Sequence, residues 1–348
     1  MIPATRPTTQ PCDWRTLWRQ AIRDPRELLA ALDLQDLAAR VQPGAAGAFP
    51  LRVPRGFVAR MRRGDPADPL LRQVLPLEVE DRRVPGFGLD AVGDAAALAG
   101  PGMLHKYHGR ALLIATGSCA VHCRYCFRRH FPYATHTAAA DRWRGALDAV
   151  RGDPSITELI LSGGDPLSLS DARLAELFEA LPGLPQLRTL RIHTRLPVVL
   201  PERVDASLTA LLAALPVRKV VVVHANHGNE IDSDVAAACT RLRTTGALLL
   251  NQSVLLRGVN DSADALARLS ERLLDAGVLP YYLHQLDRVA GVAHFEVPEA
   301  EAAAILCRLR ERLPGYLVPQ WVRETAGAPC KTPMPARGGA VVISGNYV

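Results

Sequence analysis

The chain has 348 residues, a formal net charge of +6 at pH 7 and 48% hydrophobic residues. This length and apolar fraction suit one α/β barrel with extensions and a large buried core. The modest charge, without dense basic runs and interleaved aromatic residues, argues against nucleic-acid binding, and the short, interrupted apolar runs argue against a membrane-spanning helix.

The N-terminal third is expected to be a helical and irregular extension, residues 1–105, packed over the outside of the main domain. From Trp14 to Val41 the apolar residues recur at helical spacing, and Asp24-Pro25 divides the run into two helices. Residues 57–63 predict a short helix, and residues 65–76 predict irregular structure with one helical turn.

A regular alternation of strands and helices begins near residue 106. Strands are predicted at residues 111–116, 158–162, 187–194, 219–224, 247–254 and 281–285. Helices are predicted at residues 142–151, 171–181, 205–214, 234–244, 262–276 and 299–313. This alternation predicts an α/β fold with a parallel sheet covered on both faces. Because polar residues follow every strand, we expect a partial (β/α)6 TIM-like barrel over residues 106–298, rather than a doubly wound sheet, with residues 299–348 as a C-terminal helix and tail.

Three cysteines follow the first predicted strand in a C-x3-C-x2-C array, at Cys119, Cys123 and Cys126. Thiolates are the usual ligands of iron–sulfur clusters, and three of them leave one iron of a four-iron cluster open. The alternatives are a zinc site with a fourth ligand from elsewhere, or three structural cysteines. The tight spacing favours a [4Fe-4S] cluster. The chain has seven cysteines and no apolar signal segment, so we expect free thiols in a reducing cytoplasm.

The second predicted strand ends at Gly163-Gly164-Asp165. Two glycines allow a sharp turn and a close approach of the backbone to a ligand. The alternative is a tight strand–helix turn without a ligand.

Near the end of the sequence, Lys331 lies between Cys330 and Thr332. Such a lysine is usually exposed to solvent, but lysine can also form a Schiff base with pyridoxal phosphate (PLP). Tyr107 and Arg110, just before the first strand, are candidate ligands for the phosphate of PLP or are ordinary surface residues.

Two carboxylates lie at the ends of other elements. Asp287 follows the sixth strand, and Glu324 precedes the loop of Lys331. A buried carboxylate needs a cationic partner, which a ligand ammonium group could provide. Ion pairing with the neighbouring Arg288 or Arg323 is the simpler interpretation from the residues alone.

Taken together, the motifs resemble the lysine 2,3-aminomutase family of radical S-adenosylmethionine (SAM) enzymes that use PLP, and within it the short bacterial members linked to β-lysylation of elongation factor P. The resemblance extends from Trp14 to Pro333. It implies a partial barrel of the radical SAM type with a C-terminal segment that carries the PLP lysine. The matching motifs are Cys119-x3-Cys123-x2-Cys126-x-Arg128-Arg129, Leu161-Ser-Gly-Gly-Asp-Pro166, His193-Thr-Arg195, His224-x-Asn-His-x-Asn-Glu230, Asn251-Gln-Ser-Val-Leu-Leu-Arg-Gly-Val-Asn-Asp261, Pro280-Tyr-Tyr282 and Lys331-Thr-Pro333.

The resemblance implies a role for each matching residue. The three cysteines bind the cluster, and SAM is contacted by Tyr125, Gly163, Gly164, Asp165, His224 and Gln252. Within that set, Asp165 is expected at the SAM amino group. Lys331 holds PLP, with Tyr107 and Arg110 around the cofactor and its phosphate. The substrate is held by Arg128 at its α-carboxylate and by Asp287 and Glu324 at its ε-ammonium group.

The activity that this resemblance implies is isomerisation of L-lysine to β-lysine by 2,3-amino migration. A reductant such as flavodoxin or ferredoxin would supply electrons, and a separate ligase would attach β-lysine to elongation factor P. The long-form enzymes have aspartate in place of Glu324 and a zinc-binding C-terminal extension, so zinc is not expected here. One alternative is an aminomutase for another amino acid such as glutamate, which the two distal carboxylates would repel. The other is a non-catalytic iron–sulfur protein that binds elongation factor P.

Overall fold

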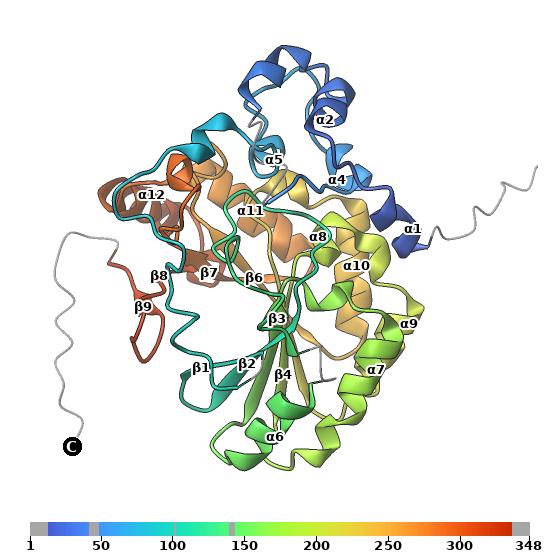
Figure 1. The fold of residues 1–348 in the computed structure, drawn as a ribbon. Helices are drawn as coiled ribbons and strands as arrows, with labels where there is room; N and C mark the ends of the chain where they lie inside the picture. Colours follow the sequence, from blue (N-terminus) through green and yellow to red (C-terminus); the bar gives the residue numbers. More distant parts are fainter. Residues whose placement is uncertain (1–12, 42–48, 101, 139–142, 336–348) are drawn as a thin grey trace, which may run out of the picture.

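The computed structural model describes residues 13–41, 49–100, 102–138 and 143–335. These residues form one nine-stranded sheet in which each strand pairs with the next one along the chain (Figure 1). The strands are β1 Met103–Tyr107, β2 Arg110–Thr116, β3 Glu158–Gly163, β4 Thr189–Thr194, β5 Arg218–Val223, β6 Leu248–Val254, β7 Leu279–His284, β8 Gln320–Arg323 and β9 Thr332–Pro333. A doubly wound sheet would reverse its strand order near the middle, so the unbroken order confirms the predicted partial barrel.

Strands β2 to β8 are parallel to their neighbours, whereas β1 and β9 run antiparallel at the two edges. The six predicted strands correspond to β2–β7 and agree within two residues at each end. The sequence analysis missed β8, the seventh parallel strand, because four residues are too few to show a pattern. It also missed the short edge strands.

Helices cover the outer face of the barrel. They are α6 Arg144–Gly152, α7 Asp171–Glu179, α8 Leu196–Val199, α9 Ala206–Ala213, α10 Ser233–Thr244, α11 Ala263–Asp275 and α12 Glu299–Arg312. The side chains of Ser170, Asp205, Asp232 and Ser262 accept hydrogen bonds from the first turns of α7, α9, α10 and α11. These N-caps explain why the predicted starts agree with the structure. The predicted start at residue 142 lies outside the described residues, as do residues 336–348.

The N-terminal part is built from short helices. They are α1 Trp14–Arg19, α2 Pro25–Ala31, η1 Gln35–Arg40, α4 Arg55–Val58, α5 Pro69–Arg72 and η2 Glu78–Asp81. Asp24 caps α2 and Pro25 occupies its first turn, which confirms the predicted break. The second predicted helix was too long, because α2 ends at Ala31 and η1 is a separate element. In Figure 1, α2, α4 and α5 lie above the barrel and α1 lies at its upper right. No helix of the described residues is long and apolar enough to cross a membrane.

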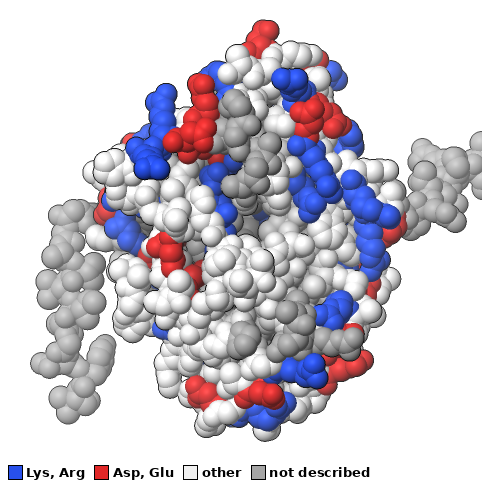
Figure 2. Space-filling view, in the orientation of Figure 1, with Lys and Arg blue, Asp and Glu red and all other residues white. Residues whose placement is uncertain are grey.

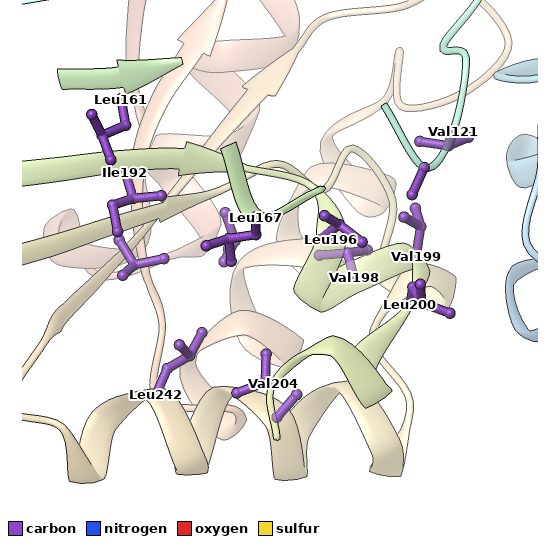
Figure 3. Close-up of a cluster of buried hydrophobic side chains, with 14 of the residues drawn as sticks. Val121, Leu161, Leu167, Ile192, Leu196, Val198, Val199, Leu200, Val204 and Leu242 are labelled. Carbon is purple, nitrogen blue, oxygen red and sulfur yellow. The ribbon is translucent and has the colours of Figure 1, made fainter. Parts of the chain in front are cut away.

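A continuous apolar core lies between the sheet and its helices. Figure 3 shows part of it, from Leu161 of β3 and Ile192 of β4 to Leu242 of α10. Val121, in the loop that carries the three cysteines, belongs to the same cluster and is 4% exposed. The core therefore fixes the cysteine loop against the barrel, because a buried apolar side chain in the loop cannot leave without exposing its surface.

Candidate active site

One cavity at the carboxyl ends of the barrel strands contains every residue that the sequence analysis assigned to a site, and it encloses about 290 Å³. Those residues are Tyr107, Arg110, Cys119, Cys123, Tyr125, Cys126, Arg128, Gly163, Gly164, Asp165, His224, Gln252, Asp287, Glu324 and Lys331. Figure 2 shows a hollow on this face with Lys and Arg side chains near its rim. The cavity is also lined by residues to which no role had been assigned, including Lys106, His193, Arg195 and His284.

The N-terminal part holds the cysteine loop by its backbone. Arg52 donates from Nη1 to the carbonyl oxygen of Cys119 at 3.1 Å. The backbone N–H of His122 donates to the carbonyl oxygen of Arg52 at 3.0 Å, and that of Arg124 donates to the carbonyl oxygen of Gln73 at 2.8 Å. The extension therefore packs against the cysteine loop and fixes its backbone, although its own residues 13–100 are not among those that line the cavity.

A buried cluster of ion pairs also holds the cysteine loop against the N-terminal part. Glu80 of η2 pairs with Arg124 at 2.5 Å and with Arg129 at 2.7 Å, and its side chain is 1% exposed. Burial by itself would raise the pKa of Glu80, but the two guanidinium groups outweigh burial and lower it. Since both arginines belong to the cysteine loop, the negative charge of Glu80 is needed to keep the loop in place.

The donor set fits an iron–sulfur cluster. Burial raises the pKa of Cys119 and raises that of Cys126 to about 11, so these sulfurs need a cationic centre to become thiolates. Among the described residues, no three His, Cys, Asp or Glu side chains are grouped as a single metal ion requires. In a four-iron cluster each cysteine binds a different iron, so such a group is not needed.

The Gly163-Gly164 turn lies directly against the cysteine loop. Gly163 has a φ of +116°, and a Cβ there would lie 2.6 Å from the carbonyl oxygen of Thr116. A Cβ on Gly164 would lie 2.4 Å from the carbonyl oxygen of Ser118. Both positions therefore require glycine, because any side chain would push the turn away from the loop.

Asp165 organises the loops after β3 and β4. Its carboxylate accepts hydrogen bonds from the Thr194 hydroxyl at 2.7 Å, from the Arg195 N–H at 2.7 Å and from the Leu196 N–H at 3.0 Å. A fourth bond comes from the Leu167 N–H at 3.0 Å. These four bonds occupy the acceptor positions of the carboxylate. The structure thus gives Asp165 a supporting task, and its direct contact with SAM stays a prediction.

Several buried polar atoms at the cavity wall have no hydrogen-bond partner among the described residues. They are the hydroxyl of Tyr107, Oε1 of Gln252 and the Nε2 atoms of His193, His224 and His284. Burial lowers the pKa of all three histidines, that of His224 to about 3, so their rings are neutral. Unpaired buried polar atoms are costly, and their convergence on one cavity indicates a polar ligand. His193 and His284 had been noticed only as polar residues at the carboxyl ends of strands, and the sequence gave them no role.

Lys331 enters this cavity from the start of β9. Its Nζ donates to Oε2 of Glu324 and lies 6.0 Å from the centre of the Tyr282 ring. The guanidinium of Arg110 lies 4.9 Å from the centre of the Tyr107 ring. A lysine, an arginine and an unpaired tyrosine hydroxyl together fit a phosphate-bearing aldehyde such as PLP.

Glu324 is neutralised by two lysines. Lys106 lies 2.9 Å from Oε1, and Lys331 contacts Oε2. Burial alone would raise the pKa of Glu324, but the two lysines lower it to about 2. The simpler interpretation from the sequence was wrong, because Arg288 pairs with Glu296 and Arg323 pairs with Glu299.

The second carboxylate, Asp287, forms no ion pair within the described part of the chain. Burial and the nearby negative charge of Glu324 raise the pKa of Asp287 to about 7. A bound cation would lower that pKa again, so Asp287 is prepared for a positively charged ligand group.

Asp94 lies behind the cavity wall and pairs with two cationic residues that line it, Lys106 and Arg128. It pairs with Lys106 at 2.6 Å and with Nε of Arg128 at 2.6 Å, and Arg128 also donates from Nη1 to Ser162 at 3.2 Å. Nη2 of Arg128 has no hydrogen bond among the described residues, which leaves it for an anionic ligand group. Asp94 and Lys106 were not assigned to the site from the sequence, although Lys106 is one of the three lysines in the chain.

The partial barrel, the three-cysteine loop at its mouth and the glycine turn against that loop are the features on which the resemblance to radical SAM enzymes rests. A scan against models of protein families found no match. The L-lysine 2,3-aminomutase of Escherichia coli is 48% identical over 324 residues, which cover 92% of this chain and 94% of that protein. The L-lysine 2,3-aminomutase of Haemophilus influenzae is 46% identical over 320 residues, which cover 92% and 95%. Among solved structures, a radical SAM methyltransferase from Sphaerobacter thermophilus is 20% identical, with a TM-score of 0.43 over 64% of this chain and 68% of that chain. Because these two curated relatives are 48% and 46% identical over most of both chains, this chain belongs to the L-lysine 2,3-aminomutase family.

Proposed function

We propose that this chain is an isomerase that converts L-lysine to β-lysine by moving the amino group from C2 to C3, with a [4Fe-4S] cluster, SAM and PLP. The observation that carries this proposal is the single cavity that contains the cysteine loop, the glycine turn, Lys331 and two carboxylates. The names of the two relatives support lysine as the substrate.

When bound, the cluster and SAM supply a carbon radical, and PLP supplies an electron sink for the migrating amino group. The chain's own residues supply position and charge. The amine of Lys331, which contacts Glu324, would hold PLP, and Tyr107 and Arg110, which contact each other, would meet the phosphate. The cavity walls exclude water, which protects a reactive carbon radical from side reactions.

The charges in the cavity match the two ends of lysine. Arg128, through its remaining Nη2, binds the α-carboxylate, while Asp287 and Glu324 bind the ε-ammonium group. Glutamate would place a carboxylate beside Asp287, which has no cationic partner among the described residues, and would be repelled when Asp287 is ionised. Lysine and glutamate should therefore be assayed side by side, and turnover of glutamate without turnover of lysine would contradict this assignment.

We further propose that β-lysine passes to a ligase that modifies elongation factor P in the cytoplasm, and that flavodoxin or ferredoxin supplies the electrons. The resemblance to short bacterial members supports this placement. The intact mass of elongation factor P from cells with and without the gene tests it. An unchanged mass would show that the isomerase does not supply β-lysine for this modification.

The decisive experiment is anaerobic reconstitution with iron, sulfide, PLP and SAM, followed by amino-acid analysis with lysine as substrate. We expect β-lysine and 5′-deoxyadenosine. Lys331→Ala should lose the PLP absorbance band and β-lysine formation and keep the colour of the cluster. Lys219→Ala, whose amine contacts the carbonyl oxygen of Leu215 outside this cavity, is the control. Retention of activity in Lys331→Ala would refute the role of that lysine.

A further inference from the structure

Arg195, at the end of β4, lies under the cysteine loop and is 5% exposed. Its Nη1 donates to Sγ of Cys123 at 2.7 Å and to the hydroxyl of Tyr125 at 2.5 Å. One nitrogen of a buried cation thus reaches both a predicted cluster ligand and the aromatic residue that precedes the last cysteine. The sequence analysis quoted this arginine within a motif but gave it no role.

The other side of the guanidinium is fixed just as firmly. Nη2 of Arg195 donates to Oε1 of Gln73 at 2.8 Å and to Oε2 of Glu230 at 2.9 Å. Glu230 is fully buried, and its other oxygen accepts from the backbone N–H groups of Asn226 at 2.8 Å and His227 at 3.0 Å. Four of the five N–H donors of Arg195 are therefore engaged, so the group cannot rotate away from the sulfur.

The two charged partners, Arg195 and Glu230, are arranged so that the cation is the one next to Cys123. Glu230 pairs with Nη2 of Arg195, whereas Nη1 contacts Cys123, so a positively charged N–H group still faces the sulfur. Hydrogen bonds to the sulfurs and nearby charge are among the factors that set the reduction potential of iron–sulfur clusters. An added electron makes the cluster and its thiolates more negative, and a cationic donor at one thiolate stabilises that reduced form more than the oxidised form.

We propose that Arg195 is a positioning residue that orients Cys123 and Tyr125 and raises the reduction potential of the cluster. This inference rests on the proposed function, because it requires that the three cysteines bind a cluster. Glu230 and Gln73 hold the guanidinium in place, so the N-terminal extension acts on the redox centre through Gln73.

The test replaces both charges at once, with Arg195→Gln and Glu230→Gln in one protein, so that no buried charge remains unpaired. The midpoint potential is measured by a potentiometric titration followed by electron paramagnetic resonance, in reconstituted protein without lysine or PLP. We expect the ratio of reduced to oxidised cluster at a fixed potential to fall about tenfold, which is a midpoint about 59 mV more negative for one electron.

A matched control exists in the same barrel. Arg203 is fully buried and pairs with Asp171 at 2.8 Å, and its guanidinium donates to the carbonyl oxygen of Leu167, away from the cysteines. The double variant Arg203→Gln with Asp171→Asn should keep the wild-type midpoint. Arg195→Lys keeps the charge but cannot contact Cys123, Tyr125 and Glu230 together, so it should shift the midpoint in the same direction by a smaller amount.

An unshifted midpoint in the Arg195/Glu230 double variant overturns this inference. If that variant does not fold, an unshifted midpoint in Arg195→Lys overturns it instead. A wild-type protein without a reducible cluster overturns the proposed function as well. A normal wild-type signal beside an unshifted variant overturns only the role of Arg195.

Discussion

Asp287→Asn should weaken the binding of lysine more than any other single loss of charge at the distal end of the cavity. Glu324 already has two cationic partners, Lys106 and Lys331. Asp287 has no ion pair within the described part of the chain, and burial raises its pKa to about 7. The ε-ammonium group of the substrate is thus the natural partner of Asp287, and an amide at this position removes a charged hydrogen bond.

The size of the effect follows from that contact. A hydrogen bond to a charged group contributes about 1.5–3 kcal/mol, which is about a 10- to 150-fold increase in the KM for lysine. The KM of the wild-type enzyme for lysine should also depend on pH. Lysine binds the ionised form of Asp287, so affinity rises as pH rises through about 7 and levels off above it. Below that point the apparent KM increases by about tenfold for each pH unit.

The assay is the KM for lysine in the anaerobic reaction, measured from about pH 6 to about pH 8. Asp287→Asn should show a high KM that no longer changes around pH 7. Asp264→Asn is the control, because Asp264 is exposed and pairs with Arg312 outside the cavity. The reasoning is refuted if the two variants have the same KM, or if the wild-type KM is constant across this range.

Two further variants test how the cysteine loop is held. Glu80→Gln leaves two buried arginines without a counter-charge, so the free energy of unfolding in urea should fall by about 3–5 kcal/mol and iron loading should fall with it. Glu27→Gln, which breaks the exposed pair with Arg55, should cost less than about 1 kcal/mol, and equal losses in both variants would contradict the importance of burial. Gly164→Ala places a Cβ 2.4 Å from the carbonyl oxygen of Ser118 and should abolish both iron loading and SAM binding, measured by iron analysis and equilibrium dialysis. Gly152→Ala, with no atom within 4 Å of its Cβ, should behave as wild type, and normal SAM binding by Gly164→Ala would show that the turn can move.

The local features of this protein were predictable from the sequence. Hydrophobic runs located β2–β7 because buried parallel strands are apolar on both faces, and Ser170, Asp205, Asp232 and Ser262 marked the helix starts because capping acts over three residues. The cysteine spacing and the Gly163-Gly164 pair were equally visible. In each case the pattern itself is formed by residues that are neighbours along the chain.

Only the tertiary structure decided which charged groups meet. Glu324 could have paired with Arg288 or Arg323, but folding placed it against Lys106, which is 218 residues away in the sequence. Asp94 carried no distinguishing local pattern and Arg195 stood in a motif without an assigned role, yet Asp94 pairs with Lys106 and Arg128, and Arg195 donates to Cys123. Burial strengthens such pairs and also fixes their partners, because an unpaired charge in the interior is too costly. Composition thus determined that charges were available, and the fold determined where each one acts.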